Sequence, residues 1–260
     1  MNSGKTGKAA VLRGLHVPGN PVVMPNAWDA ASARLVAEAG FPAVATSSAA
    51  VAAVLGWDDG EASPVEEVLA AVSRIVHSVS VPVTVDFERG YGLKPAELVE
   101  RFAGTGAVGL NLEDSEPATG TMVDAAEQAD FLAAVRAAAE AASVDLVINA
   151  RTDCFLRRAG TPQEQLAASI DRGTRYLAAG ADCVYPLGVA ESEVIRALVE
   201  AIPGPVNVGR GPQATLTLAD LASLGVARVT FGPSLQRTVY GWFVSSVLRS
   251  LADEFPPATG

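Results

Sequence analysis

The sequence contains few cysteines and no excess of basic charge. Only Cys154 and Cys183 occur among 260 residues, which argues against a disulfide framework and favours a reduced, cytoplasmic protein with buried thiols. The formal net charge of −10 argues against a nucleic acid or an anionic membrane as a partner, because either would need a basic face. An anionic substrate would therefore need local neutralisation by a metal ion or an arginine.

Long hydrophobic runs are also missing. No stretch reaches the roughly 18 consecutive apolar residues of a membrane span. The N-terminal segment, residues 1–14, is basic and polar and lacks the apolar core of a secretory signal. We therefore expect a protein that neither crosses nor binds a membrane.

What the sequence does contain is a strand-helix pattern repeated eight times. The repeats predict a single (β/α)8 barrel domain of the TIM type over residues 1–260, preceded by an N-terminal helix or arm over residues 1–20. An open doubly wound sheet is the competing fold, but no Gly-x-Gly-x-x-Gly follows the first strand. The predicted strands are 22–25, 42–46, 82–87, 107–112, 145–150, 182–185, 205–208 and 228–231. The predicted helices are 28–40, 64–78, 94–104, 124–141, 162–179, 190–201, 215–224 and 233–253.

The catalytic end of such a barrel is built from the loops that follow the strands. Polar and charged residues crowd at the ends of the second to fifth predicted strands, where the carboxylates Asp86, Glu88 and Glu113 lie on neighbouring strands. Oxygen ligands of this kind suit Mg²⁺, and Mn²⁺ fits the same donors. The alternative interpretation is that they are helix caps or solvated loop charges.

Two further groups are candidates for substrate binding. Arg151 follows the fifth strand, where its guanidinium could bind a carboxylate through two hydrogen bonds or pair internally with Glu113 or Asp153. The segment Thr46-Ser47-Ser48-Ala49 predicts a small oxyanion-binding turn, although a turn needed only for packing is nearly as well supported. Trp28 either lines the pocket or packs against the first helix. The segment Gly209-Arg210-Gly211 is weak evidence for a phosphate cradle.

Neither histidine is expected to act in catalysis. His16 precedes the barrel, and His77 lies near the end of the predicted helix 64–78, on the opposite face from the site. Acid-base chemistry would then fall to carboxylates, a hydroxyl group or metal-bound water.

Taken together, these motifs resemble the isocitrate lyase and phosphoenolpyruvate mutase superfamily. The matching pieces are the Ser47 turn with Leu55-Gly56-Trp57-Asp58-Asp59-Gly60, the run from Asp86 to Gly92, Leu112-Glu113-Asp114, and Asn149-Ala150-Arg151-Thr152-Asp153. The resemblance implies an Mg²⁺-dependent enzyme that acts on a small 2-oxo or 2-hydroxy acid through a pyruvate enolate.

The resemblance also implies individual roles. Asp86 is implied as the direct metal ligand, with Glu88 and Glu113 binding directly or through water, and Arg151 as the carboxylate clamp. Asp59 is implied beside the reacting centre. Ser47, Ser48 and Ala49 correspond to the oxyanion-binding turn, although the family often has glycine where Ser48 stands. Members commonly form dimers that exchange the eighth helix and pair into tetramers, so a homodimer or homotetramer is expected.

The loop after the fourth strand departs from the superfamily pattern. Lyase members carry a Lys-Lys-Cys-Gly-His segment there, whereas residues 115–121 read Ser-Glu-Pro-Ala-Thr-Gly-Thr. This argues against cleavage of isocitrate or methylisocitrate, and the missing lysines and asparagine argue equally against a phosphonopyruvate-forming mutase. We predict a carbon-carbon lyase, acting by decarboxylation or retro-aldol cleavage. The alternatives are phosphorus-carbon chemistry and a metabolite-binding barrel without turnover.

Overall fold

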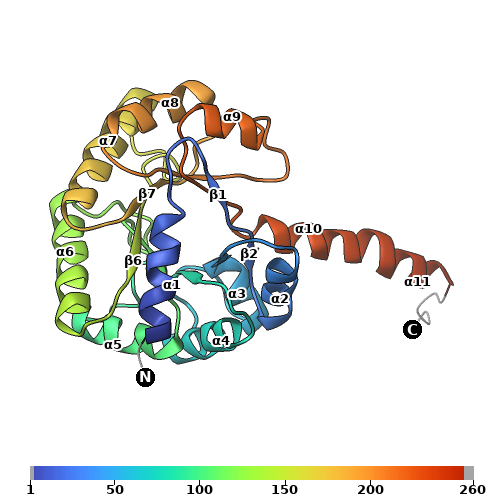
Figure 1. Ribbon diagram of the computed structural model, residues 1–260. Helices are drawn as coiled ribbons and strands as arrows, with labels where there is room; N and C mark the ends of the chain where they lie inside the picture. Colours follow the sequence, from blue (N-terminus) through green and yellow to red (C-terminus); the bar gives the residue numbers. More distant parts are fainter. Residues whose placement is uncertain (1–2, 255–260) are drawn as a thin grey trace.

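The computed structural model describes residues 3–254, so residues 1–2 and 255–260 of the predicted domain lie outside the described part (Figure 1). Its strands all run parallel. They are β1 (Val22–Val23), β2 (Asn26–Ala27), β3 (Val44–Thr46), β4 (Val83–Asp86), β5 (Gly109–Glu113), β6 (Val147–Thr152), β7 (Cys183–Pro186), β8 (Asn207–Gly209) and β9 (Arg228–Thr230).

The strands close into a barrel. Strands β2 to β7 pair in sequence order, while β1 pairs with β9 and β9 with β8. A bridge between Val184 and Val206 joins the two sheets. Of the first predicted strand, 22–25, only β1 is observed as strand, and β2 lies just beyond its predicted end; Pro25, which has no N–H to donate to a ladder, lies between the two. The predicted TIM-type barrel is confirmed by this topology.

Helices surround the barrel on its outer face (Figure 1). They are α2 (Ala30–Glu38), α3 (Ser48–Leu55), α4 (Val65–His77), α5 (Pro95–Thr105), α6 (Ala125–Ala141), α7 (Pro162–Ala178), α8 (Ser192–Ala201) and α9 (Leu218–Ser223). Their apolar faces cover the outward side chains of the strands, such as Val83 and Val85 on β4. No helix among residues 3–254 has the length and apolar character needed to cross a bilayer.

The N-terminal helix α1 (Ser3–Gly14) closes one end of the barrel. Its Leu12 packs with Val22, Met24, Ala45 and Val147. Arg13 holds the helix in place by ion pairs to carboxylates that precede β6 and β7, Asp145 and Asp182, each at 2.7 Å. The open end, at the carboxyl ends of the strands, is left for chemistry.

The structure corrects two local predictions. Residues 48–55 form α3, although a loop was expected there; this Ala-Val segment ends at Gly56 in the left-handed conformation, with φ of 86°. The predicted helix 233–253 is present, but α10 (Ser234–Trp242) and α11 (Arg249–Glu254) flank a π-helical segment, η1 (Phe243–Leu248). This rod projects away from the barrel (Figure 1).

Candidate active site

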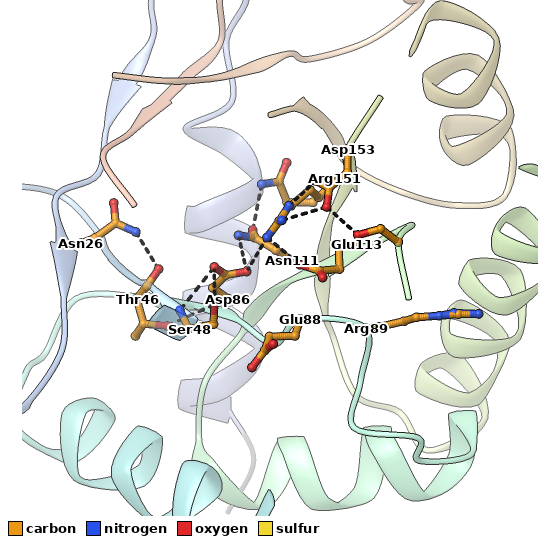
Figure 2. Close-up of polar contacts among 12 residues, drawn as sticks. Asn26, Thr46, Ser48, Asp86, Glu88, Arg89, Asn111, Glu113, Arg151 and Asp153 are labelled. Carbon is orange, nitrogen blue, oxygen red and sulfur yellow. Dashed lines mark hydrogen bonds and ion pairs between the residues drawn. The ribbon is translucent and has the colours of Figure 1, made fainter. Parts of the chain in front are cut away.

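Asp86 is the last residue of β4, and its carboxylate lies at the centre of the polar contacts (Figure 2). Oδ2 accepts hydrogen bonds from the Ser48 backbone N–H at 3.3 Å and from the Ser48 hydroxyl at 3.2 Å. Oδ1 accepts one from Asn111 Nδ2 at 3.3 Å. The register explains the second contact, because Asp86 pairs with Asn111, and residues paired in register point to the same face of the sheet.

Arg151 lies one strand further, on β6, in register with Glu113 of β5. Its Nη1 is 2.5 Å from Glu113 Oε2 and 4.0 Å from Asp86 Oδ1. Its Nε and Nη2 donate to the two carboxylate oxygens of Asp153 at 2.6 and 2.9 Å. The internal ion pairs allowed by the sequence are therefore both present, and the guanidinium joins three carboxylates (Figure 2).

Glu88 occupies a strained turn just beyond β4. Its φ is 49°, a left-handed value that non-glycine residues rarely adopt. The Glu61 backbone N–H donates to Oε2 at 2.6 Å, and the Tyr91 hydroxyl donates to Oε1 at 2.7 Å. Gly90 has φ of 98°, and a Cβ there would lie 2.8 Å from Leu98 Cδ1, so only glycine fits this turn. Strained backbone of this kind clusters at functional sites.

The carboxylates at this end of the barrel outnumber the cations. Burial raises the pKa of Glu88 to about 7, and the neighbouring Asp59 and Asp86 act in the same direction. Burial also raises the pKa of Glu113, although Arg151 opposes the shift. At the exposed rim, partial desolvation raises the pKa of Asp59 against a hydrogen bond from Ser48. The site therefore holds more negative charge than Arg151 neutralises.

This excess of oxygen donors fits a divalent cation, although the ligands are not preassembled. Among residues 3–254, no three His, Cys, Asp or Glu side chains are grouped as a finished metal site. Asp86 and Glu113 lie on neighbouring strands, whereas Glu88 is engaged by Glu61 and Tyr91. Mg²⁺ retains several waters and takes one or two carboxylates, so Asp86 with a single neighbour is chemically sufficient.

The predicted oxyanion-binding turn is in fact the N-terminus of α3. Ser47 is its N-cap, and Ser48 and Ala49 are its first residues. Unpaired N–H groups and the positive end of the helix dipole favour an anion at this position. The Ser48 N–H already donates to Asp86, which ties the two parts of the site together.

The loop after β5 lies across the rim of the site. Ser115 and Met122 form an antiparallel bridge, and a Cβ on Gly60 would lie 3.7 Å from the Pro117 carbonyl oxygen, so the loop contacts the segment that carries Asp59. The Ser115 hydroxyl donates to Asp153 Oδ2 at 2.7 Å. The loop thus reaches the carboxylate that holds Arg151.

Other predicted residues lie apart from this group. Trp28 packs edge-to-face against Tyr240 of α10, with ring centroids 6.3 Å apart, and its backbone N–H donates to the Ser32 hydroxyl of α2 at 3.0 Å. Gly209-Arg210-Gly211 lines a cavity of about 360 Å³ whose other walls are mainly apolar, which does not suit a phosphate.

The histidines and cysteines also lie outside this group. His16 is buried and donates a hydrogen bond to the Leu12 carbonyl, and His77 is exposed and bonds to Ser73 of its own helix. Both cysteines are buried and free.

Three residues that contribute to the site were not predicted from the sequence: Glu61, Tyr91 and Arg228. Glu61 accepts from the backbone N–H groups of Arg89 and Tyr91 and so shapes the turn that carries Glu88. Tyr91 was visible only as part of a Gly-Tyr-Gly turn. Arg228 could have been found, because a charged residue within the apolar run Val226–Phe231 points to a buried polar role.

The raised pKa of Glu88 predicts a pH dependence of stability. Its ordinary pKa of 4.5 rises to about 7 on folding, so the native state holds the proton more tightly, and stability falls as pH rises from about 4.5 to about 7. The loss is on the order of 3 kcal/mol at most. Glutamine does not titrate, so Glu88→Gln should lack this pH-dependent loss of stability. The metal-free variant should therefore unfold several degrees above the wild type at pH 8.

The measurement is thermal unfolding between pH 4 and 8 in the presence of EDTA. Glu140→Gln, an exposed position on α6, is the control and should keep the wild-type profile. An unchanged pH profile in Glu88→Gln would contradict the assignment.

Comparison with known proteins shows which family the chain resembles. A family model described as phosphoenolpyruvate phosphomutase matches residues 12–251. The 2-methylisocitrate lyase of Escherichia coli (strain K12) is 30% identical over 250 residues, which cover 86% of this chain and 81% of that protein.

Solved structures show the same relationship. A Burkholderia cenocepacia J2315 protein provisionally assigned as a phosphonomutase is 44% identical, with a TM-score of 0.86 over 92% of this chain and 98% of that one. A phosphonopyruvate hydrolase in complex with oxalate and Mg²⁺ is 26% identical, with a TM-score of 0.80 over 97% of this chain and 91% of that one.

Proposed function

Because this chain belongs to the phosphoenolpyruvate phosphomutase family, within the isocitrate lyase and phosphoenolpyruvate mutase superfamily of enzymes, we propose that it is an Mg²⁺-dependent lyase that breaks a carbon-carbon bond of a small 2-oxo or 2-hydroxy acid. The observation that carries the proposal is the position of Arg151, whose Nη1 lies 4.0 Å from Asp86 and 2.5 Å from Glu113. One fixed cation beside an excess of carboxylates suits an anionic ligand that binds together with a divalent metal ion.

The metal would be held by Asp86, with Glu113 and Glu88 binding directly or through water. These are hard oxygen donors, and burial, followed by the charge of neighbouring carboxylates, raises the pKa values of Glu88 and Glu113. Mn²⁺ could replace Mg²⁺ on the same donors. When bound, the metal would supply the positive charge that stabilises an enolate oxygen.

Arg151 is proposed to bind the substrate carboxylate. In the described arrangement Nη1 is taken by Glu113, while Asp153 holds Nε and Nη2 and so fixes the plane of the guanidinium. A Glu113 side chain that turns toward a metal would release Nη1 for the substrate. Planar, preoriented donors of this kind favour carboxylate binding at little entropic cost.

The N-terminus of α3 would complete the oxyanion site. Ser47, Ser48 and Ala49 form the start of this helix, and the Ser48 N–H lies beside Asp86, where an enolate oxygen would form. Asp59, which interacts with Ser48, would orient the leaving portion of the substrate or a water molecule. Trp28, which contacts Tyr240 of α10, is given no role in this site.

Decarboxylation of a 2-oxo diacid breaks the bond between C3 and the leaving carboxylate, whose electron pair forms the enolate; the fragment leaves as CO₂, and C3 is then protonated to give a 2-oxo acid. In retro-aldol cleavage, the hydroxyl on the cleaved carbon gives its proton to a carboxylate or water of the site as that carbon becomes a carbonyl group. The electron pair of the broken bond then forms an enolate on the other fragment, which is protonated, and one of the two products is a 2-oxo acid. The loop after β5 contains no Cys, Lys or His, so the proton must come from a carboxyl group, a hydroxyl group or water.

The test is turnover of a panel of C3 to C6 2-oxo and 2-hydroxy diacids, followed by release of the 2-oxo acid product. Activity should require Mg²⁺ and disappear with EDTA. Absence of Mg²⁺-dependent turnover for every member of the panel would refute the lyase assignment.

A second candidate is phosphorus-carbon chemistry on a phosphonopyruvate-like substrate. The support is the 44% identity to the provisionally assigned phosphonomutase. A ³¹P NMR spectrum of phosphonopyruvate incubated with the protein and Mg²⁺ distinguishes the two reactions. If oxalate binds with Mg²⁺ but neither substrate class turns over, the remaining alternative, a metabolite-binding barrel, is favoured.

The projecting C-terminal rod supports self-association. Within α10, η1 and α11, seven large side chains are between 42% and 60% exposed: Val239, Tyr240, Trp242, Phe243, Val244, Leu248 and Leu251. An apolar surface of this kind on a helix that leaves its own barrel (Figure 1) suits exchange with a second copy of the chain. We therefore propose a homodimer or homotetramer with an exchanged C-terminal helix.

The double variant Trp242→Glu/Phe243→Glu should shift the protein to monomers. Each aromatic side chain buries roughly 150–250 Å² in an interface, and the lost burial, at roughly 25 cal/mol per Å², should raise the dissociation constant by at least about 100-fold. Light scattering after size-exclusion chromatography measures the mass. Leu35→Glu, an exposed position on α2, is the control, and a monomeric wild type would contradict the proposal.

A further inference from the structure

Arg228 is a buried cation without a counter-ion. It lies on β9, inside the barrel, in register with Val22 and Asn207, and its exposed fraction is 1%. None of the ion pairs among residues 3–254 includes it, and its Nε and Nη1 have no hydrogen-bond partner. Burying a charge in this state is unfavourable, so the residue works against stability.

The groups that face Arg228 do not neutralise it. Burial raises the pKa of Cys183 to about 12 and lowers the pKa of His16 to about 4, so both are uncharged at neutral pH. Tyr185 is buried, and burial raises the pKa of its hydroxyl. Asp86 is the one carboxylate whose charge acts on the Arg228 guanidinium among the described residues.

Arg228 reaches Asp86 through Asn111. Its Nη2 lies 3.4 Å from Asn111 Oδ1, which also accepts a hydrogen bond from Asn149 Nδ2 at 2.8 Å. With two donors on its oxygen, the Asn111 amide must direct Nδ2 the other way, where it donates to Asp86 Oδ1 at 3.3 Å. Figure 2 shows Asn111 between Asp86 and Arg151.

We propose that Arg228 is a positioning residue that acts through Asn111 on Asp86. A guanidinium cannot lose its proton or accept a hydrogen bond, so it prevents the Asn111 amide from rotating and holds the Asp86 carboxylate in one orientation. A buried residue that lowers stability, as an unpaired charge does, is expected where function requires it. This inference rests on the proposed function, because it assigns Asp86 to the binding of metal and anion.

The experiment uses oxalate as the probe, titrated calorimetrically into the full-length protein at saturating Mg²⁺. In Arg228→Met, oxalate affinity should fall at least tenfold, while the metal-free variant unfolds at or above the wild-type temperature because an unpaired buried charge has been removed. In an Asn111→Ala background, the same change should weaken binding less than threefold, since the two residues act in series.

Each outcome decides the inference. The inference is overturned if Arg228→Met binds oxalate within twofold of the wild-type affinity. It is also overturned if Arg228→Met weakens oxalate binding tenfold both in the wild type and in the Asn111→Ala variant. If Arg228→Met does not fold, Arg228→Gln replaces it in the cycle with the same criteria. A wild type that does not bind oxalate with Mg²⁺ overturns the proposed function and this inference together, whereas wild-type binding with an unaffected variant overturns this inference alone.

Discussion

Replacing Arg151 by glutamine is expected to weaken carboxylate binding and to destabilise the metal-free protein. The guanidinium pairs with Glu113 and with both oxygens of Asp153, which are 4% and 0% exposed. Removing one partner of a buried ion pair costs about 3–5 kcal/mol, because the remaining charge is left without compensation. Part of this cost will be relieved by protonation of Glu113, whose pKa is already raised by burial.

The loss of oxalate binding in Arg151→Gln should be a second measurable effect beside the loss of stability. A hydrogen bond to a charged group contributes about 1.5–3 kcal/mol, so losing the Nη1 contact to the substrate carboxylate should weaken oxalate binding with Mg²⁺ by roughly 10- to 100-fold. Arg151→Lys should not restore it, because an ammonium group cannot reproduce the planar fork.

Calorimetry and urea unfolding provide the two readouts for Arg151. Arg175→Gln, which breaks an exposed pair between Arg175 and Asp171 on α7, is the matched control and should change stability by less than about 1 kcal/mol. Oxalate affinity retained in a folded Arg151→Gln variant would remove Arg151 from the proposed binding site.

Changing Asp86 to alanine should eliminate the response to metal. At a free Mg²⁺ concentration 100 times its dissociation constant, the wild type should gain about 2.7 kcal/mol of stability. Asp86→Ala should gain nothing measurable. Without metal, the variant should be about as stable as the wild type, because removing one carboxylate relieves repulsion with Glu88 and Asp59 while leaving three donors to Asp86 without their acceptor.

Metal binding by Asp86→Ala can be measured directly with Mn²⁺ by electron paramagnetic resonance. Asp171→Ala on α7 serves as the control for a lost surface carboxylate. Mn²⁺ affinity equal to that of the wild type would show that the ion binds elsewhere or through Glu88 and Glu113 alone.

Local sequence patterns predicted the barrel and the end of it that carries the site. Short apolar runs alternating with helical repeats identify parallel strands, so Asp86, Glu113 and Arg151 could be assigned to the ends of neighbouring strands. Because β4, β5 and β6 then pair in register, these residues meet where expected. Helix α3 was missed because residues 48–55 are uniformly small and apolar and show no amphipathic repeat.

Asp86 and Glu88 show most clearly which features follow from the local sequence and which depend on the fold. Their types and their i, i+2 spacing predict two carboxylates on one face of an extended strand. The chain instead leaves the strand at Phe87 and turns Glu88 into a left-handed conformation held by Glu61 and Tyr91. Glu61 comes from a different loop, so its contact could not be inferred from the residues around Glu88.

The sequence by itself determined the repeat, the position of the charged residues at the strand ends and the family to which they belong. The tertiary structure alone decided that Arg151 lies between Glu113 and Asp153 and that Arg228 reaches Asn111 across the barrel. The reason is physical: secondary structure follows from the chemistry of neighbouring residues, whereas the partner of a buried charge depends on strand register and closure, which bring together residues as far apart as 117 positions.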